Sequence, residues 1–76
     1  MNTIMMLLGL YEKPRMSLEE TCHALGMEKG TGYQQRARGV FPVPMAGSPL
    51  TADIRDVAKA LDDMREEANF KTKHAA

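Results

Sequence analysis

The chain has no tryptophan, and its 76 residues include only two phenylalanines and two tyrosines. Leucine, methionine, valine and alanine must therefore fill the interior. A chain of this length supports one core, and such a domain buries only about 60% of the surface that its unfolded chain exposes. We expect one small domain over residues 1–69. A chain this short leaves little room for an elaborate active site, so we expect no enzyme activity and no cofactor.

A single cysteine, Cys22, excludes an internal disulfide, and no cluster of cysteine and histidine suggests structural zinc. The adjacent His23 cannot activate it as a nucleophile, because neighbouring helical residues point about 100° apart. We interpret Cys22 as a small core residue. The apolar run over residues 4–10 is far shorter than the roughly 20 residues of a membrane span, and no signal-peptide pattern accompanies it. We expect a cytoplasmic protein that does not bind membranes.

Neither sign of charge is in excess, since ten basic and ten acidic residues cancel. This balance excludes a strongly basic, non-specific nucleic-acid binder. The charges are nevertheless segregated, because residues 29–51 contain Lys29, Arg36 and Arg38 but no acidic residue. Acidic residues gather in the following segment, at Asp53, Asp56, Asp62, Asp63, Glu66 and Glu67. We interpret these carboxylates as a solvated helix face, because no histidine accompanies them as in a metal or acid–base site.

Apolar residues at the start of the chain recur with the spacing of one helix face, at Ile4, Leu7, Leu8 and Tyr11. This spacing predicts a short helix that begins after Asn2 or Thr3 and ends before Pro14, with a strand as the alternative. Three further apolar residues lie off that face: Met5, Met6 and Leu10. A segment that is apolar on nearly all sides is either buried or paired with another chain. These three residues are therefore candidates for self-association.

Ser17 and Glu20 have the spacing of a capping box and predict the start of a helix, which Gly26 would end. This helix, over residues 17–26, would bury Leu18, Cys22 and Leu25. A second short helix is expected over residues 29–38, with Tyr33 and Ala37 buried. Its exposed polar residues would be Thr31, Gln34, Gln35 and Arg38, with Arg36 either exposed or packed over apolar surface. Two short helices joined by a tight turn are typical of a helix-turn-helix.

Residues 40–51 favour a short or rudimentary β wing, because prolines between apolar residues allow only an edge strand or an extended connector at 40–44. Phe41 is the predicted core anchor of this segment. Thr51 is the predicted cap of a helix over residues 52–68. The apolar stripe of that helix is Ile54, Val57, Ala58, Leu61, Met64 and Ala68. A flexible tail is expected over residues 70–76.

Several short motifs, taken in order, resemble the pyocin-activator family: Met1-Asn2-Thr3, Leu7-Leu8, Tyr11-Glu12, Pro14, Leu18-Glu19, Cys22, Gly39 through Pro44, and Asp56-Val57-Ala58 followed by Leu61-Asp62. Thr31, Tyr33 and Gly39-x-Phe41-Pro42 also resemble AlpA-like prophage regulators and small excisionases. The resemblance implies a mainly α, MerR-like winged helix-turn-helix that binds phage or prophage DNA, either regulating transcription or assisting an integrase in excision. Two departures stand out: residues 40–52 contain no Lys or Arg, and polar residues or glycine replace aliphatic ones at Gly32, Gln35 and Arg36.

The candidate DNA-binding residues are Lys29, Thr31, Gln34, Gln35, Arg36 and Arg38. Gln can pair bidentately with adenine, and Arg can pair bidentately with guanine. Lys29 and Thr31, near the start of the helix, suit contact with a phosphate. Further candidates for phosphate contact are Arg15, Ser48, Lys71 and Lys73. Double-stranded DNA, a phage integrase, RNA polymerase and a second copy of the chain are the expected partners. Two alternatives stay open: a merely solvated helix face, and a phage module that binds a host or phage protein without DNA.

Overall fold

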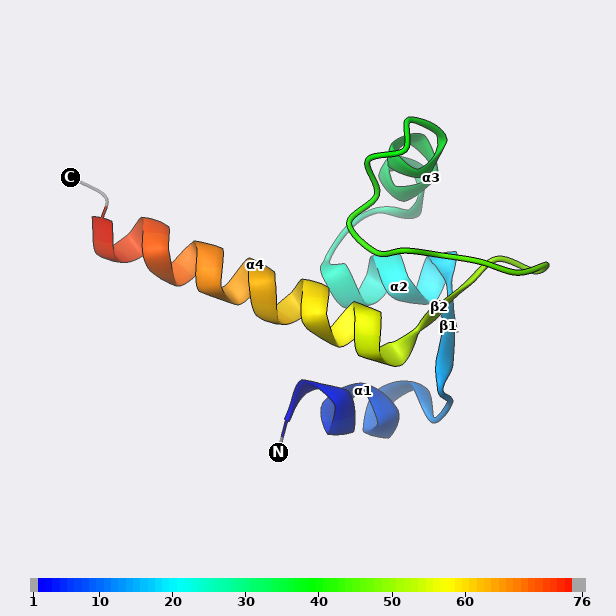
Figure 1. Ribbon diagram of the computed structural model, residues 1–76, viewed down its shortest axis with the longest axis horizontal. Helices are drawn as coiled ribbons and strands as arrows, with labels where there is room; N and C mark the ends of the chain where they lie inside the picture. The colour runs from blue at the N-terminus through cyan, green and yellow to red at the C-terminus, as the bar shows by residue number, and fades with distance from the viewer. Residues whose placement is uncertain (1, 75–76) are drawn as a thin grey trace.

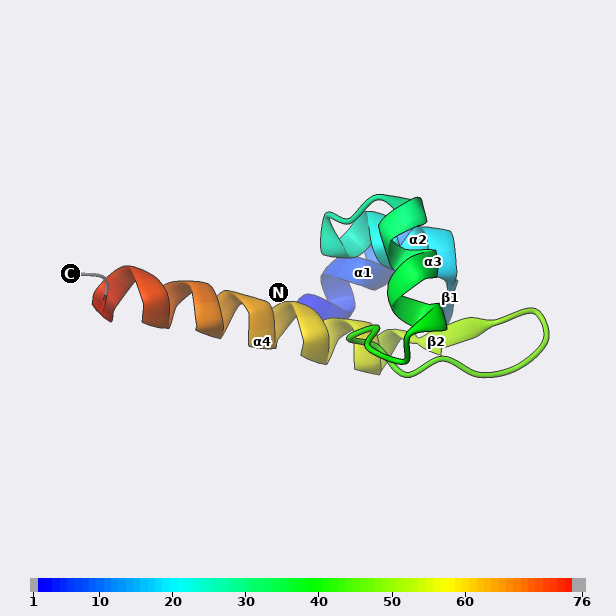
Figure 2. The same ribbon diagram turned by 90° about the horizontal axis from the view of Figure 1, so that it is seen from above.

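The computed structural model describes residues 2–74, and their side chains through residue 72. The elements follow the order α1 (Thr3–Tyr11), β1 (Arg15–Ser17), α2 (Leu18–Leu25), α3 (Lys29–Ala37), β2 (Thr51–Asp53) and α4 (Ile54–His74). Both α1 and α2 pack on the first half of α4, and α3 packs on α2 (Figure 1). The second half of α4 projects away from the other elements in both views (Figures 1 and 2). The expected mainly helical class is confirmed for the described residues.

A two-stranded antiparallel sheet joins the segments that precede α2 and α4. Met16 of β1 lies opposite Ala52 of β2, and both residues are fully buried. The backbone N–H of Ile54 donates to the carbonyl of Pro14 at 3.0 Å, which extends the pairing to the first residue of α4. The sheet therefore sets where both helices begin. The strand at β1 was not predicted from the sequence.

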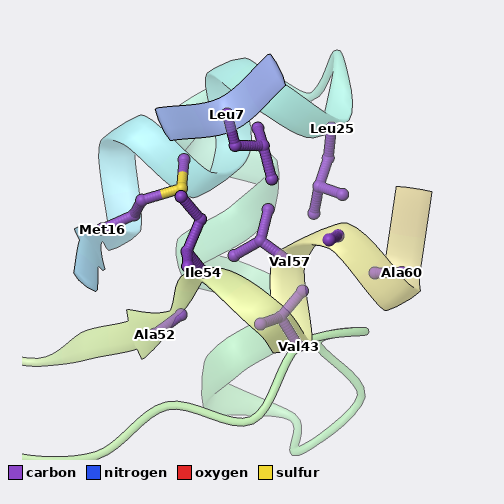
Figure 3. Close-up of a cluster of buried hydrophobic side chains, with 9 residues drawn as sticks. Leu7, Met16, Leu25, Val43, Ala52, Ile54, Val57 and Ala60 are labelled. Carbon is purple, nitrogen blue, oxygen red and sulfur yellow. The ribbon is translucent and has the colours of Figure 1, made fainter. Parts of the chain in front are cut away.

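The core is built mainly on the first two turns of α4 (Figure 3). Its buried hydrophobic residues are Leu7, Met16, Leu25, Val43, Ala52, Ile54, Val57, Ala58 and Ala60. The predicted stripe of α4 is confirmed for Ile54, Val57 and Ala58 but is wrong for Met64, which is 45% exposed, and for the exposed Ala68. The helix simply continues past the elements that could cover these two residues. Phe41 is only partly buried, and Val43 is instead the buried anchor of its segment.

The local signals at the two N-terminal helices are confirmed. The side chain of Asn2 caps α1 by accepting from the backbone N–H of Met5. Both hydrogen bonds of the capping box are present at α2, since the N–H of Glu20 donates to the Ser17 hydroxyl and the N–H of Ser17 donates to the Glu20 carboxylate. Gly26 ends α2 in the left-handed conformation with φ of 73°. The predicted inward residues of α2 are all buried: Leu18, Cys22 and Leu25.

The bounds of the last helix differ from the prediction. Thr51 lies in β2 and does not cap α4; the carboxylate of Asp53 does so, by accepting from the N–H of Arg55 at 2.8 Å. Residues 70–74 of the expected flexible tail continue the helix, and residues 75–76 lie outside the described range. No glycine or proline follows residue 49 to end the helix. The i,i+4 ion pair between Glu67 and Lys71 also supports the last turns.

The predicted wing segment has no strand of its own before Thr51. Its tip is a turn closed by one bridge, in which Ala46 and Thr51 exchange two backbone hydrogen bonds of 2.9 Å. Residues 40–44 form no strand; they are a connector with a bend at residues 42–43. The segment is therefore a loop that returns the chain from α3 to the sheet.

Gly32 is the buried residue of α3, and it lies directly against Cys22 of α2. A Cβ atom at this position would lie 2.2 Å from the Sγ atom of Cys22, so only glycine permits this approach. The prediction that Tyr33 and Ala37 are buried is wrong, because Tyr33 is 52% exposed and Ala37 is also exposed. With Gly32 inward, the next residue along the helix turns away by about 100°.

We expect Gly32→Ala to lower the free energy of unfolding, because overpacking of this kind costs about 1–3 kcal/mol and exceeds the gain of about 1 kcal/mol in helix propensity. Gly30→Ala is the matched control, since no atom lies within 4 Å of a Cβ there, and it should stabilise the protein. Urea unfolding measures both changes. The double variant Gly32→Ala/Cys22→Ala should recover part of the loss; equal losses with and without Cys22 would contradict the clash.

The capping box also predicts a pH dependence of stability. Hydrogen bonds from Lys13 and Ser17 lower the pKa of Glu20 below its ordinary value. A carboxyl group whose pKa is lowered by folding contributes stability above its unfolded pKa and loses it as the pH falls through the folded pKa. Thermal unfolding of the wild type should therefore weaken between about pH 5 and pH 3 more steeply than that of Glu20→Gln. Glu66→Gln controls for net charge, and parallel curves for wild type and Glu20→Gln would refute the prediction.

Candidate functional site

The outer face of α3 is exposed. Because Gly32 faces α2, helical periodicity places Gly30, Gln34 and Ala37 on the opposite side, and all three are exposed. The same periodicity places Thr31 and Arg38 together on one flank of this face. Gln34 thus lies between Gly30 and Ala37. The Thr31 hydroxyl and the Arg38 guanidinium lie on the flank beside it.

The structure brings the predicted DNA-binding residues onto one helix but exposes them unequally. Five are exposed: Lys29, Thr31, Gln34, Arg36 and Arg38. Gln35 is half-buried and lies toward the inner side of α3. Arg36 borders a hollow of about 260 Å³ that Phe41 and Val43 also line. It therefore lies on the flank of α3 beside the apolar loop, away from the outer face, and it remains exposed.

The start of α3 carries a cation and uncapped backbone N–H groups. Glu28 occupies the N-cap position without making a side-chain cap hydrogen bond. The Nζ atom of Lys29 lies 3.7 Å from a carboxylate oxygen of Glu19, and its side chain is two-thirds exposed. An ion pair this exposed contributes little stability, so an incoming anion can exchange for Glu19 at small cost.

Tyr33 is an exposed residue of this site that the sequence did not predict. Its ring lines a hollow of about 340 Å³ together with Leu18 and Glu19 of α2 and Leu50 of the loop. Gly32 is the signal that could have revealed it, because a glycine inside a helix often marks close backbone approach. If Gly32 is taken as the contact residue, Tyr33 necessarily turns outward.

The other predicted phosphate contacts are not gathered beside α3. The guanidinium of Arg15 donates to the Thr51 hydroxyl at 2.8 Å and to the Thr51 carbonyl at 3.2 Å, which ties it to the sheet. Ser48 is exposed in the turn of the loop. Lys71 pairs with Glu67 on the projecting half of α4, away from α3 (Figures 1 and 2). The side chain of Lys73 lies outside the described part of the chain.

Two ionisable groups outside α3 with shifted pKa values are part of the folded structure. Burial, with a smaller effect of Glu19, raises the pKa of the Cys22 thiol, which keeps this buried residue protonated. Arg55 holds the pKa of Asp53 well below its ordinary value through hydrogen bonds from its side chain and backbone. Among the side chains of residues 2–72, no three His, Cys, Asp or Glu lie close enough together to hold a metal ion. None of the described helices is long and apolar enough to cross a membrane.

Comparison of the chain with profiles of protein families, with curated proteins and with solved structures gives no match. The resemblance to prophage regulators thus stays an expectation carried by short motifs. The function proposed below depends on α3 and its surroundings.

Proposed function

We propose that this chain is a sequence-specific DNA-binding protein of the helix-turn-helix type, in which α2 supports α3 and α3 enters the major groove. The observation that carries the proposal is the outer face of α3, where Gln34 and Arg38 are both exposed. The chain would act as a phage or prophage regulator of transcription, as an excisionase, or as both. No catalytic step is included in this proposal.

The residue types on the outer face suit base recognition. Gln34 has an amide that can pair with N6 and N7 of adenine, and Arg38 has a guanidinium that can pair with O6 and N7 of guanine. Gly30 and Ala37, on either side of Gln34, keep the helix narrow at this face. A narrow face favours close approach of the α3 backbone to base edges in the groove.

The start of α3 suits a phosphate. Lys29 supplies a charge on a long side chain, and the first-turn N–H groups add the positive end of the helix dipole. Contacts of this kind set the orientation of the protein without reading sequence. Tyr33, which borders the adjacent hollow and is 52% exposed, adds an aromatic side chain beside the site.

The loop of residues 40–50 contributes no cation to this proposal, since it contains no Lys or Arg. Affinity must then come from α3 and from cooperation with another protein. An integrase, RNA polymerase or a second copy bound to an adjacent site would supply it.

The uncharged loop and the zero net charge favour a second candidate, a phage-encoded module that binds a host or phage protein without DNA. The two candidates differ in their dependence on salt. Affinity for DNA falls steeply as salt rises because condensed counterions are released on binding, whereas an apolar protein interface is far less sensitive.

Selection of bound duplexes from a randomised pool tests the proposal directly. We expect enrichment of one sequence motif and binding to it that exceeds binding to scrambled duplex and weakens with salt. Retention of no duplex above background by the folded chain would reject DNA binding and favour the second candidate.

Arg38→Ala should weaken binding to the selected duplex by about 1–3 kcal/mol, and base preference should relax at one position of the motif. Arg65→Ala is the matched control, because it removes the same side chain from α4. Fluorescence anisotropy with single-base variants of the duplex measures both effects. Unchanged affinity and unchanged preference in Arg38→Ala would show that this face does not read bases.

Lys29→Ala should weaken binding to all duplexes alike and reduce the slope of log affinity against log salt by about one, as expected for one lost phosphate contact. Lys59→Ala, on α4, is the control and should leave the slope unchanged. Salt titrations with selected and scrambled duplexes provide the measurement. A change of base preference in Lys29→Ala would contradict the phosphate role.

A further inference from the structure

The outer side of α1 carries only apolar side chains and glycine. On its inner side Leu7 is buried against the core, and the Tyr11 hydroxyl lies 2.7 Å from Nδ1 of His23 on α2. Four large apolar residues remain exposed on the same helix: Met5 at 57%, Met6 at 41%, Leu8 at 41% and Leu10 at 68%. Residues 4–10 include no charged or polar side chain. Helices that face water normally carry polar residues there, so this surface has the character of an interface.

The projecting part of α4 is a second surface that none of the described helices and strands covers. We call residues 62–74 the overhang; it begins where the Thr3 hydroxyl of α1 donates to the Asp62 carboxylate. Helical periodicity places Met64 and Ala68 on the same face as Val57 and Leu61, which pack toward the core. Both are exposed. A helical segment of this length is marginal in water without tertiary contacts.

We propose that a second copy of this chain covers both surfaces at once, in a two-fold symmetric dimer in which the outer side of α1 of each copy packs on the overhang of the other. Each α1 would then lie between two α4 helices, its own and that of the partner. The new contact continues one that already exists within the chain. α1 packs on the first half of α4, where Val57 and Leu61 belong to the core cluster, and helical periodicity carries the same face of α4 on to Met64 and Ala68.

Symmetry and charge favour a second copy over another occupant. Each chain has one α1 surface and one overhang surface, and a two-fold axis pairs both in a closed assembly. The centres of the two surfaces carry no charged side chain. Gly9 lies at the middle of the outer side of α1, and Ala68 lies on the overhang face. At the edge, Glu67 is already paired with Lys71 at 2.8 Å. The proposal is independent of DNA binding, since neither surface includes a residue of α3.

Sedimentation equilibrium of the full chain, from micromolar to hundreds of micromolar at high salt, tests the association. We expect a dimer for the wild type and a monomer for Ala68→Glu, which introduces a charge at an exposed position and retains a good helix former. Val40→Glu is the control, because Val40 is 61% exposed on the loop beyond α3, and it should remain dimeric. Circular dichroism verifies that each variant is folded. A monomeric wild type, or a dimeric Ala68→Glu, would overturn the proposal; DNA binding by a monomeric wild type would still support the proposed function.

Disulfide trapping tests which surfaces meet. Gly9→Cys and Ala68→Cys proteins are prepared separately, mixed and oxidised; no atom lies within 4 Å of a Cβ at position 9, so that side chain is tolerated. Cys22 is buried and should not react. Because a disulfide requires Cα atoms within about 7 Å, we expect a predominant link between positions 9 and 68 of different chains, identified by peptide mass spectrometry. Predominant links between two positions 68 or two positions 9, or no link, would overturn the arrangement.

Discussion

The pairing of Met16 with Ala52 is the contact on which the rest of the fold depends. Both residues are completely buried, and the strands that hold them continue directly into α2 and α4. A shift of the pairing by one residue would turn both side chains out of the core, since strand residues alternate between faces. It would also move Ser17 and Asp53 relative to each other, although each caps the helix that follows it. The short sheet therefore determines how α2 lies against α4.

The position of α3 depends in turn on α2 and on one glycine. Cys22 is buried on the side of α2 that faces α3, and glycine is the only residue type that fits against its sulfur atom at position 32. This contact rotates α3 so that Gln34 and Arg38 face outward and Gln35 turns partly inward. A base-reading surface requires side chains held in fixed positions. The orientation of the proposed recognition face is thus set by the packing of Gly32 against the Cys22 thiol. It is not set by the helix propensity of α3, which is low.

The features predicted well from the sequence are those with local signals. Ser17 with Glu20, and Gly26 in a left-handed turn, mark α2 by contacts within a few residues, and the structure confirms them. β1 was missed because three residues are too short to show a strand period and their partner lies far along the chain. Tyr33 was misplaced because its register depends on the contact between two helices. Five of the six residues proposed to bind DNA lie in α3 and Arg38 is its C-cap, but which of them share the outer face depends on the position of Gly32.

The two proposals together explain how a chain with few cations near α3 could bind DNA with useful affinity. One copy has three cations between residues 29 and 51, and Arg36 is turned toward the loop, so few phosphate contacts are available to a monomer. Two copies joined through α1 and the overhang would present two α3 helices, and the second would bind at a high effective concentration. Two-fold symmetry in the protein also calls for a palindromic binding site. Dimerisation would thereby supply affinity that the uncharged loop does not, and apolar residues of α1 would contribute to DNA binding without touching DNA.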